Sequence, residues 1–214
     1  MRRVVPWVIC LVALDQTIKL IIANFFIDTE FTIVQNFLYF YVTQNTYLGW
    51  IPSMLGVAMP LYVAVFLVII SWLFIVIAHR YLIFITYDFT KYKTIPHLFL
   101  ALLLSASICK LIDDIFWGGS LDFILLFDWF IFDLKDVYIT IGVSLTMFYA
   151  ITYEVLQYKN FSKEERKENT KKHSFLRWLK TVYQQHQAHP RYCIKPHVCH
   201  TYHVIAASEP QSHE

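Results

Sequence analysis

The chain has 214 residues, of which 57% are hydrophobic and only 16% are charged, whereas soluble domains usually carry about a quarter charged residues. The apolar residues come in long unbroken runs, which excludes a soluble all-helical protein and indicates lipid as the surrounding solvent. The net charge is +2, and the basic residues gather in a tail and beside the apolar runs, so no nucleic acid partner is expected.

Four apolar runs approach the ~20 residues that an α-helix needs to cross a bilayer. The predicted spans are residues 4 to about 26, 54–78, 95–112 and 137 to about 156. A shorter run at 81–86 either extends the second helix or lies at the membrane interface. The first run is not expected to be a cleaved signal peptide, because Asp15 and Lys19 interrupt it and no small-residue cleavage site follows.

The distribution of lysine and arginine predicts the orientation of these spans. Basic residues precede the first span, separate the second from the third, and follow the fourth. Residues 27–53 contain none, and residues 113–136 contain several aspartates and a single lysine. The positive-inside rule therefore places both termini in the cytoplasm and the two acidic connections outside. We expect a multi-pass protein of a bacterial cytoplasmic (inner) membrane.

The connection between the first two spans predicts β-structure. Residues 31–43 are rich in β-branched and aromatic residues, which favour short strands. These strands either rest at the membrane interface as an amphipathic sheet or simply cap the bundle. The predicted fold is an all-α integral membrane protein with four transmembrane helices and a small extracytoplasmic interfacial β region between helices one and two. Residues 1–158 form the membrane domain.

Residues 159–214 are expected to form a basic, His-containing cytoplasmic tail that is partly disordered. Residues 162–172 indicate a solvated helix end. The apolar residues of 175–183 then repeat at helical spacing beside Arg177 and Lys180, which predicts a basic helix lying on anionic lipid. The ligand spacing is not that of a standard zinc site, so an incidental tail is favoured over a metal site. The tail residues considered as ligands are Cys193, His197, Cys199, His200 and His203.

Ionisable residues inside apolar spans are costly and often mark function. Asp15 and Lys19 lie four residues apart on one helix face, where an ion pair that stabilises the bundle is favoured over direct chemistry. At the end of the third span, Lys110 can reach Asp113 and Asp114 at helical spacing.

Two further aspartates, Asp122 and Asp136, are expected at the outer ends of helices three and four. Because these helices are antiparallel neighbours, the two carboxyl groups could meet at the membrane surface. Close carboxyl groups share one proton, and such a pair can act as general base and acid in aspartic peptidase chemistry. The alternative reading of both is a helix cap or a surface charge.

These residues resemble the lipoprotein signal peptidase (signal peptidase II) family over about the first 157 residues. Four blocks occur in the family's order. The blocks are Asp15-Gln16-Thr17-Ile18-Lys19 for D-Q-x-x-K, Asn45-Thr46 for N-T-G, Asp113 with Gly118 and Asp122-Phe123 for N-x-x-D-R…G-x-V-x-D-F, and Phe132-Asp133-Leu134-Lys135-Asp136 for F-N-x-A-D.

The resemblance implies that Asp122 and Asp136 are the catalytic pair. It implies supporting roles for the site or substrate at Asp15, Lys19, Asn45, Lys110, Asp113 and Asp133. The substrates would be the signal peptides of diacylglyceryl-modified prolipoproteins, cut before the lipidated cysteine, in contact with membrane lipid. No metal or organic cofactor is expected, and the protein is expected to be a monomer.

The chain also departs from the family pattern. Lys110 replaces an asparagine and Asp114 an arginine, so Lys110 is hypothesised to replace the bracing role of that arginine. Asp133 replaces an asparagine and Lys135 a small residue. These departures leave open a catalytically inactive relative that binds lipidated segments or acts as a scaffold. An ion-coupled carrier built on the charged residues of spans one and three is disfavoured, because the charges cluster on the outer side.

Overall fold

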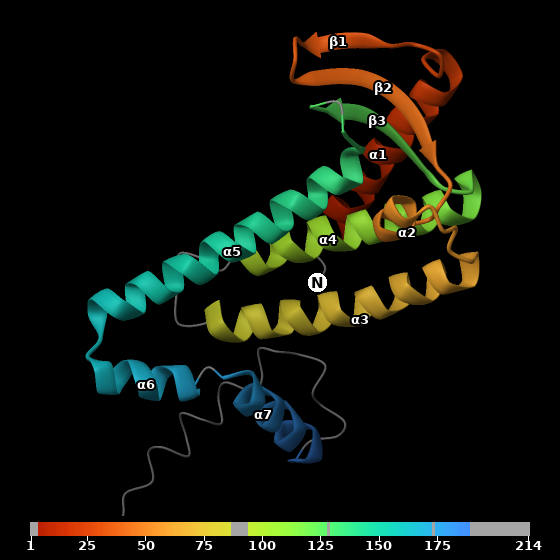
Figure 1. Ribbon diagram of the computed structural model, residues 1–214. Helices are drawn as coiled ribbons and strands as arrows, with labels where there is room; N and C mark the ends of the chain where they lie inside the picture. The colour runs from red at the N-terminus through yellow and green to blue at the C-terminus, as the bar shows by residue number, and fades with distance from the viewer. Residues whose placement is uncertain (1–3, 87–93, 128, 173, 189–214) are drawn as a thin grey trace, which may run out of the picture. The chain divides into compact units, whose positions relative to one another are not determined.

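The computed structural model describes residues 4–86, 94–127, 129–172 and 174–188 (Figure 1). The chain forms two compact units, Met1–Asn160 and Phe161–Glu214. In the second unit, helices α6 (Lys163–Lys172) and α7 (Phe175–Ala188) have the predicted helical character. The expected disordered end and the Cys/His group of the tail lie outside the described residues, and the contact of α7 with lipid stays a prediction.

Among the described residues, four helices of the first unit are long and apolar enough to cross a membrane, which confirms the four predicted spans. Much of their apolar surface faces outward, since Phe66 and Phe74 are 60% and 65% exposed. Such surface is stable only in lipid. The helices are α1 (Val5–Phe25), α3 (Leu61–Thr86), α4 (Ile95–Ile112) and α5 (Leu134–Asn160).

The predicted bounds of the second span, residues 54–78, are wrong at both ends. A separate short helix, α2 (Trp50–Leu55), comes first and ends at Gly56, which has a left-handed φ of 63°. Pro60 then directly precedes α3, and α3 continues without a break through residues 81–86. That shorter run therefore extends the second spanning helix, one of its two predicted placements.

A four-stranded antiparallel sheet lies at the end of the bundle where α1 and α4 finish and α3 and α5 begin (Figure 1). The strands are β1 (Phe31–Val34), β2 (Leu38–Asn45), β3 (Ser120–Leu126) and β4 (Phe130–Phe132), in the order β1-β2-β3-β4. The strands predicted between the first two spans are confirmed. The other two strands, between α4 and α5, were not predicted, and the placement of Asp122 at a helix end is wrong because Asp122 lies within β3.

A tight turn brings β3 against β2. Helix α4 runs on into a π-helical turn, η2 (Asp113–Trp117), and Gly118 and Gly119 then reverse the chain. Residue 119 has a φ of 149°, and a Cβ atom there would lie only 2.4 Å from the carbonyl oxygen of Asn45. Glycine at this position is what allows Ser120 to pair with Asn45 and start the β2–β3 ladder.

Alternation along β3 separates its apolar and polar side chains. Leu121 and Phe123 are buried in a small apolar cluster with Ile22 of α1. Ser120 and Asp122 take the alternate positions, so they project from the other face of the strand. Both are also buried, which places a hydroxyl and a carboxyl group together inside the sheet end of the bundle.

Candidate active site

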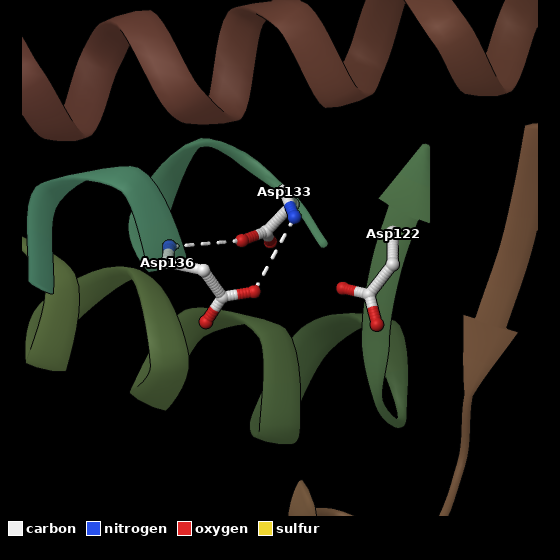
Figure 2. Close-up of side chains that lie close together, drawn as sticks. All are labelled: Asp122, Asp133 and Asp136. Carbon is white, nitrogen blue, oxygen red and sulfur yellow. Dashed lines mark hydrogen bonds between the residues drawn. The ribbon is translucent and has the colours of Figure 1, made fainter. Parts of the chain in front are cut away.

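Three carboxyl groups converge between β3 and the start of α5. One carboxylate oxygen from each of Asp122, Asp133 and Asp136 lies within 4.8 Å of the others. In Figure 2 the side chain of Asp122 points from its strand toward the other two. The predicted partners Asp122 and Asp136 are therefore brought together, although one comes from a strand instead of a helix end.

The first turn of α5 fixes the positions of Asp133 and Asp136. The backbone N–H of Asp136 donates to Oδ1 of Asp133 over 3.3 Å, and the backbone N–H of Asp133 donates to Oδ2 of Asp136, also over 3.3 Å (Figure 2). This reciprocal pattern is a capping box, which satisfies two N–H groups that the helix start would leave unpaired. The helix cap considered for Asp136 is therefore present, and its carboxyl group also lies near Asp122. A catalytic role for Asp136 stays a prediction.

Lys135 places a buried ammonium group beside these carboxylates. Its Nζ atom donates to Asp133 and to the hydroxyl of Ser120, and it lies 3.2 Å from Oδ2 of Asp113 and 3.7 Å from Oδ1 of Asp122. The residue is only 5% exposed. A charge buried this deeply is stable only when it is paired and hydrogen-bonded, as it is here.

A second buried lysine joins the same network from α1. Nζ of Lys19 lies 2.6 Å from Oδ2 of both Asp113 and Asp133, and 3.1 Å from Oδ2 of Asp15. The predicted pairing of Asp15 with Lys19 is therefore present, and Lys19 also connects α1 to η2 and to the start of α5. The side chain of Gln16 extends the network by donating to Asp15 and Asp113.

The charges of this network do not balance if every group is ionised. Two ammonium groups, Lys19 and Lys135, face five carboxyl groups, so the cluster favours retaining protons. Burial raises the pKa of Asp122 to about 6, although Lys135 and the Ser120 hydroxyl lower it. The carboxyl groups of the network are those of Asp15, Asp113, Asp122, Asp133 and Asp136.

Asp133 differs from Asp122 in its proton affinity. Burial alone would raise the pKa of Asp133, but its contacts with Lys135 and Lys19 outweigh burial and hold that pKa below the usual value. Asp133 is thus the ionised partner of both lysines. Asp122 and Asp136 remain as the two carboxyl groups able to share a proton.

Three carboxylates at this spacing could in principle ligate a divalent cation. The donor set does not fit one well, because Lys135 and Lys19 already neutralise Asp133, and Lys135 also lies beside Asp122. A metal would have to compete with two buried ammonium groups. The geometry fits proton exchange between carboxyl groups better than metal binding.

Two predicted site residues lie at the edge of the network. Lys110 pairs with Asp114 and donates to the carbonyl oxygen of Leu48 over 3.1 Å. The structure gives Lys110 no ion pair with Asp113 among the described residues, so only one of its two predicted contacts forms. Asn45 uses its side-chain oxygen to accept the backbone N–H of Tyr47 over 3.2 Å and pairs in register with Ser120.

Three residues of the network were not predicted as site residues. Ser120 and Lys135 contact the carboxylates directly, and Gln16 bridges Asp15 and Asp113. A signal existed for the first two. Ser120 lies two residues before Asp122, the spacing that places side chains on one face of a strand, and Lys135 is a charged residue at the edge of an apolar run.

Two bacterial membrane enzymes, both solved by the in meso method, are similar to this chain in fold. The structure at 2.3 Å resolution is 24% identical with a TM-score of 0.55, and 76% of this chain covers 93% of that chain. The structure at 1.9 Å resolution is 21% identical with a TM-score of 0.50, and 70% of this chain covers 93% of that chain. A comparison with curated proteins finds no match.

The family described as signal peptidase (SPase) II matches residues 7–152. The match includes most of α1, the whole sheet, η2 and most of α5, and therefore every residue of the buried network. The second unit, from Phe161 onward, lies outside it. The resemblance carried by the four sequence blocks is confirmed, and the chain belongs to the signal peptidase II family.

Proposed function

We propose that this protein is a membrane-embedded aspartic endopeptidase. It removes signal peptides from diacylglyceryl-modified prolipoproteins by cutting before the lipidated cysteine. The observation that carries this proposal is the approach of the Asp122 and Asp136 carboxylate oxygens within 4.8 Å at the sheet end of a membrane helix bundle. Family membership supports the choice of substrate.

The pair supplies both functions that peptide hydrolysis requires. The ionised carboxylate takes a proton from a water molecule as the water oxygen attacks the scissile carbonyl carbon. The protonated partner donates a hydrogen bond to the carbonyl oxygen as negative charge develops there. Proton transfer to the peptide nitrogen then breaks the C–N bond, leaving a carboxylate on the signal peptide and an amine on the lipidated cysteine.

An apolar groove supports the proposal that the substrate is embedded in lipid. It has a volume of about 240 Å³ and lies between the second half of α1 and the first two strands. A signal helix or an acyl chain entering sideways from the bilayer would meet apolar side chains here, on the face of the sheet that carries Leu121 and Phe123, while the Asp122 carboxyl group lies on the other face. The groove is lined by Ile18, Ile21, Ile22, Phe26, Phe31 and Phe40.

We further propose that both termini are cytoplasmic and that the sheet end faces outward, as the distribution of basic residues predicts. A membrane-impermeant thiol reagent tests this with single cysteines placed at exposed positions 28 and 163 of a cysteine-free variant. Labelling in intact cells is expected at position 28 and not at 163. The reverse pattern would contradict the orientation.

The activity is tested with purified protein and a lipidated reporter prolipoprotein. Asp122→Asn and Asp136→Asn are each expected to lower the rate of cleavage by about 10²-fold or more, because each removes a proton-transfer group. Asp28→Asn is the matched control, since Asp28 is exposed in the turn after α1. Unchanged processing by either site variant would contradict the peptidase proposal.

The second candidate is a relative that binds lipidated segments without cutting them. The observation favouring it is the pair of charged residues, Asp133 and Lys135, that replaces an asparagine and a small residue of the family pattern inside the site. A wild-type protein that retains the reporter on affinity beads but never cleaves it would support this candidate.

A further inference from the structure

We propose that Lys135 is a positioning residue that keeps Asp122 ionised, so that Asp122 activates the water and Asp136 carries the shared proton. This inference rests on the proposed peptidase function. It concerns a residue at which this chain departs from the family pattern, which has a small residue at that position. The contacts of the Lys135 ammonium group carry it.

The first step is the orientation of the Ser120 hydroxyl. Lys135 has only N–H donors, so its contact with the Ser120 oxygen uses that oxygen as an acceptor. The single hydroxyl hydrogen must then point elsewhere, and its shortest acceptor is Oδ1 of Asp122 at 2.7 Å. Lys135 thus directs a hydrogen-bond donor onto Asp122 through Ser120.

The second step is the asymmetry between the two carboxyl groups. Oδ1 of Asp122 receives the Ser120 hydroxyl and lies 3.7 Å from the Lys135 ammonium. Asp136 accepts one backbone N–H over 3.3 Å and, among the described residues, forms no ion pair. The charge of Lys135 acts on Asp136 as well, so the difference between the two carboxyl groups comes from the Ser120 hydroxyl, which Lys135 directs onto Asp122. That hydrogen bond stabilises the charged form of Asp122, so the proton that the pair shares resides on Asp136.

The third step is the surroundings of Asp122 as a whole. Each element packed against β3 must be counted, because a charge there affects the titration of Asp122 when it lies close enough. Strand β2 contributes Tyr39 and Tyr41 and no charged residue, and β4 contributes no titratable residue. The charged groups that face the site are Asp15 and Lys19 of α1, Lys110 of α4, Asp113 and Asp114 of η2, Asp133 at the cap, and Lys135 and Asp136 of α5.

Of the cations in that set, Lys135 is the one that reaches Asp122. Lys19 is taken up by Asp15, Asp113 and Asp133, and Lys110 by Asp114. Burial still leaves the pKa of Asp122 at about 6, close enough to neutral pH that the loss of one ammonium group changes its ionisation there. Lys135 is therefore expected to affect the ionisation of Asp122 near neutral pH.

The test is the pH dependence of kcat/KM for reporter cleavage. The acid limb is the part of this profile in which kcat/KM falls as the pH decreases. In Lys135→Met the limb is expected to move to higher pH by about 1–3 units, the effect of removing one close opposite charge. On the limb, each decrease of one pH unit lowers kcat/KM tenfold. Asp133→Asn removes a negative charge near Asp122 and is expected to move the limb to lower pH. Shifts of opposite sign do not arise from a general loss of structure.

Two further variants control for folding. Lys110→Met removes a lysine of the other ion pair and is expected to leave the limb at the wild-type pH. If Lys135→Met does not fold, the Asp133→Asn/Lys135→Met double variant removes both charges of the pair, and its limb is expected at higher pH than that of Asp133→Asn alone. A limb that stays in place when Lys135 is removed overturns the proposal.

Infrared difference spectroscopy provides a readout that does not require cleavage. The protonated-carboxyl C=O band that is absent from Asp122→Asn reports the protonation of Asp122, and it is expected to persist to higher pH in Lys135→Met than in the wild type. The proposed function fails if the wild type cleaves no reporter at any pH. The inference about Lys135 fails separately if this band titrates at the same pH in both proteins.

Discussion

Two lysines distinguish this chain from the family pattern, and the structure places them in different surroundings. Lys135 is 5% exposed and contacts Asp113, Asp122 and Asp133. The side chain of Lys110 is 25% exposed and pairs with Asp114 alone, with a second contact to a backbone carbonyl. One lysine lies inside the carboxyl network, whereas the other connects α4 to the segment that follows β2.

We propose that lysine serves the chemistry of the site at position 135 and the stability of the fold at position 110. A lysine among several carboxyl groups changes how protons are distributed over them. A lysine beside one carboxylate and one carbonyl mainly satisfies those two groups. The variants below test whether this division between the Lys135 region and the Lys110 region holds.

The largest loss of stability is expected for Lys19→Met, because among the described residues it leaves buried Asp15 without an ion pair and removes one of the two lysines that contact Asp113 and Asp133. The free energy of unfolding is expected to fall by about 3–5 kcal/mol. Thermal unfolding in detergent micelles measures it, with Lys163→Met in exposed α6 as the control. Equal stability of the two variants would show that the network contributes little to the fold.

The next effect is a pH dependence of stability that comes from Asp122. Its pKa is about 6 in the folded protein and 3.8 in a free side chain, so the protonated form stabilises the fold. This contribution to the free energy of unfolding is on the order of 3 kcal/mol. It is fully present below about pH 4 and is lost as the pH rises through 6. Asp122→Asn should remove it. Parallel stability curves for variant and wild type from pH 4 to 7 would contradict the prediction.

A smaller loss is expected for Lys110→Met, which leaves the buried carboxylate of Asp114 unpaired. The expected cost is about 1–2 kcal/mol, less than for Lys19 because one carboxylate is involved and the lysine is partly exposed. Unfolding in detergent measures it. If Lys110→Met also changed the pH profile of cleavage, the proposed difference in role between Lys110 and Lys135 would be contradicted.

The smallest effect is expected for Ser120→Ala. It removes the 2.7 Å hydrogen bond to Asp122 but leaves the Lys135 ammonium in place. The acid limb should move to higher pH by less than about one unit, since a single hydrogen bond contributes about 1 kcal/mol. Ser107→Ala is the control, because it removes the hydrogen bond from Trp72 in another part of the bundle. A larger shift of the limb in Ser120→Ala than in Lys135→Met would show that Ser120 affects the ionisation of Asp122 more than Lys135 does.

Hydropathy was sufficient to predict the four spans, because lipid requires long apolar segments whatever the packing. It did not give the start of α3, since residues 54–60 are as apolar as a span. The break there comes from the left-handed Gly56 and from Pro60. The conformation of the backbone, not the solvent, sets that boundary.

The site was harder to predict than the spans because its geometry depends on contacts distant in sequence. Asp122 lies on β3 because that strand pairs with β2, and no local pattern in residues 113–136 indicated this partner. The carboxyl pair was first considered because both residues were expected at the ends of adjacent helices, and the resemblance to the family then favoured it. The role of Ser120 became visible only once the strand placed it beside Asp122 and Lys135.

The sheet is assembled from two segments that the ribosome makes far apart in time. Strands β1 and β2 follow the first spanning helix, whereas β3 and β4 follow the third. Until the later pair is synthesised, the edge of β2 that binds β3 has no partner within this chain. The carboxyl network also needs the start of α5, so it is incomplete in a nascent chain until the last span has been made.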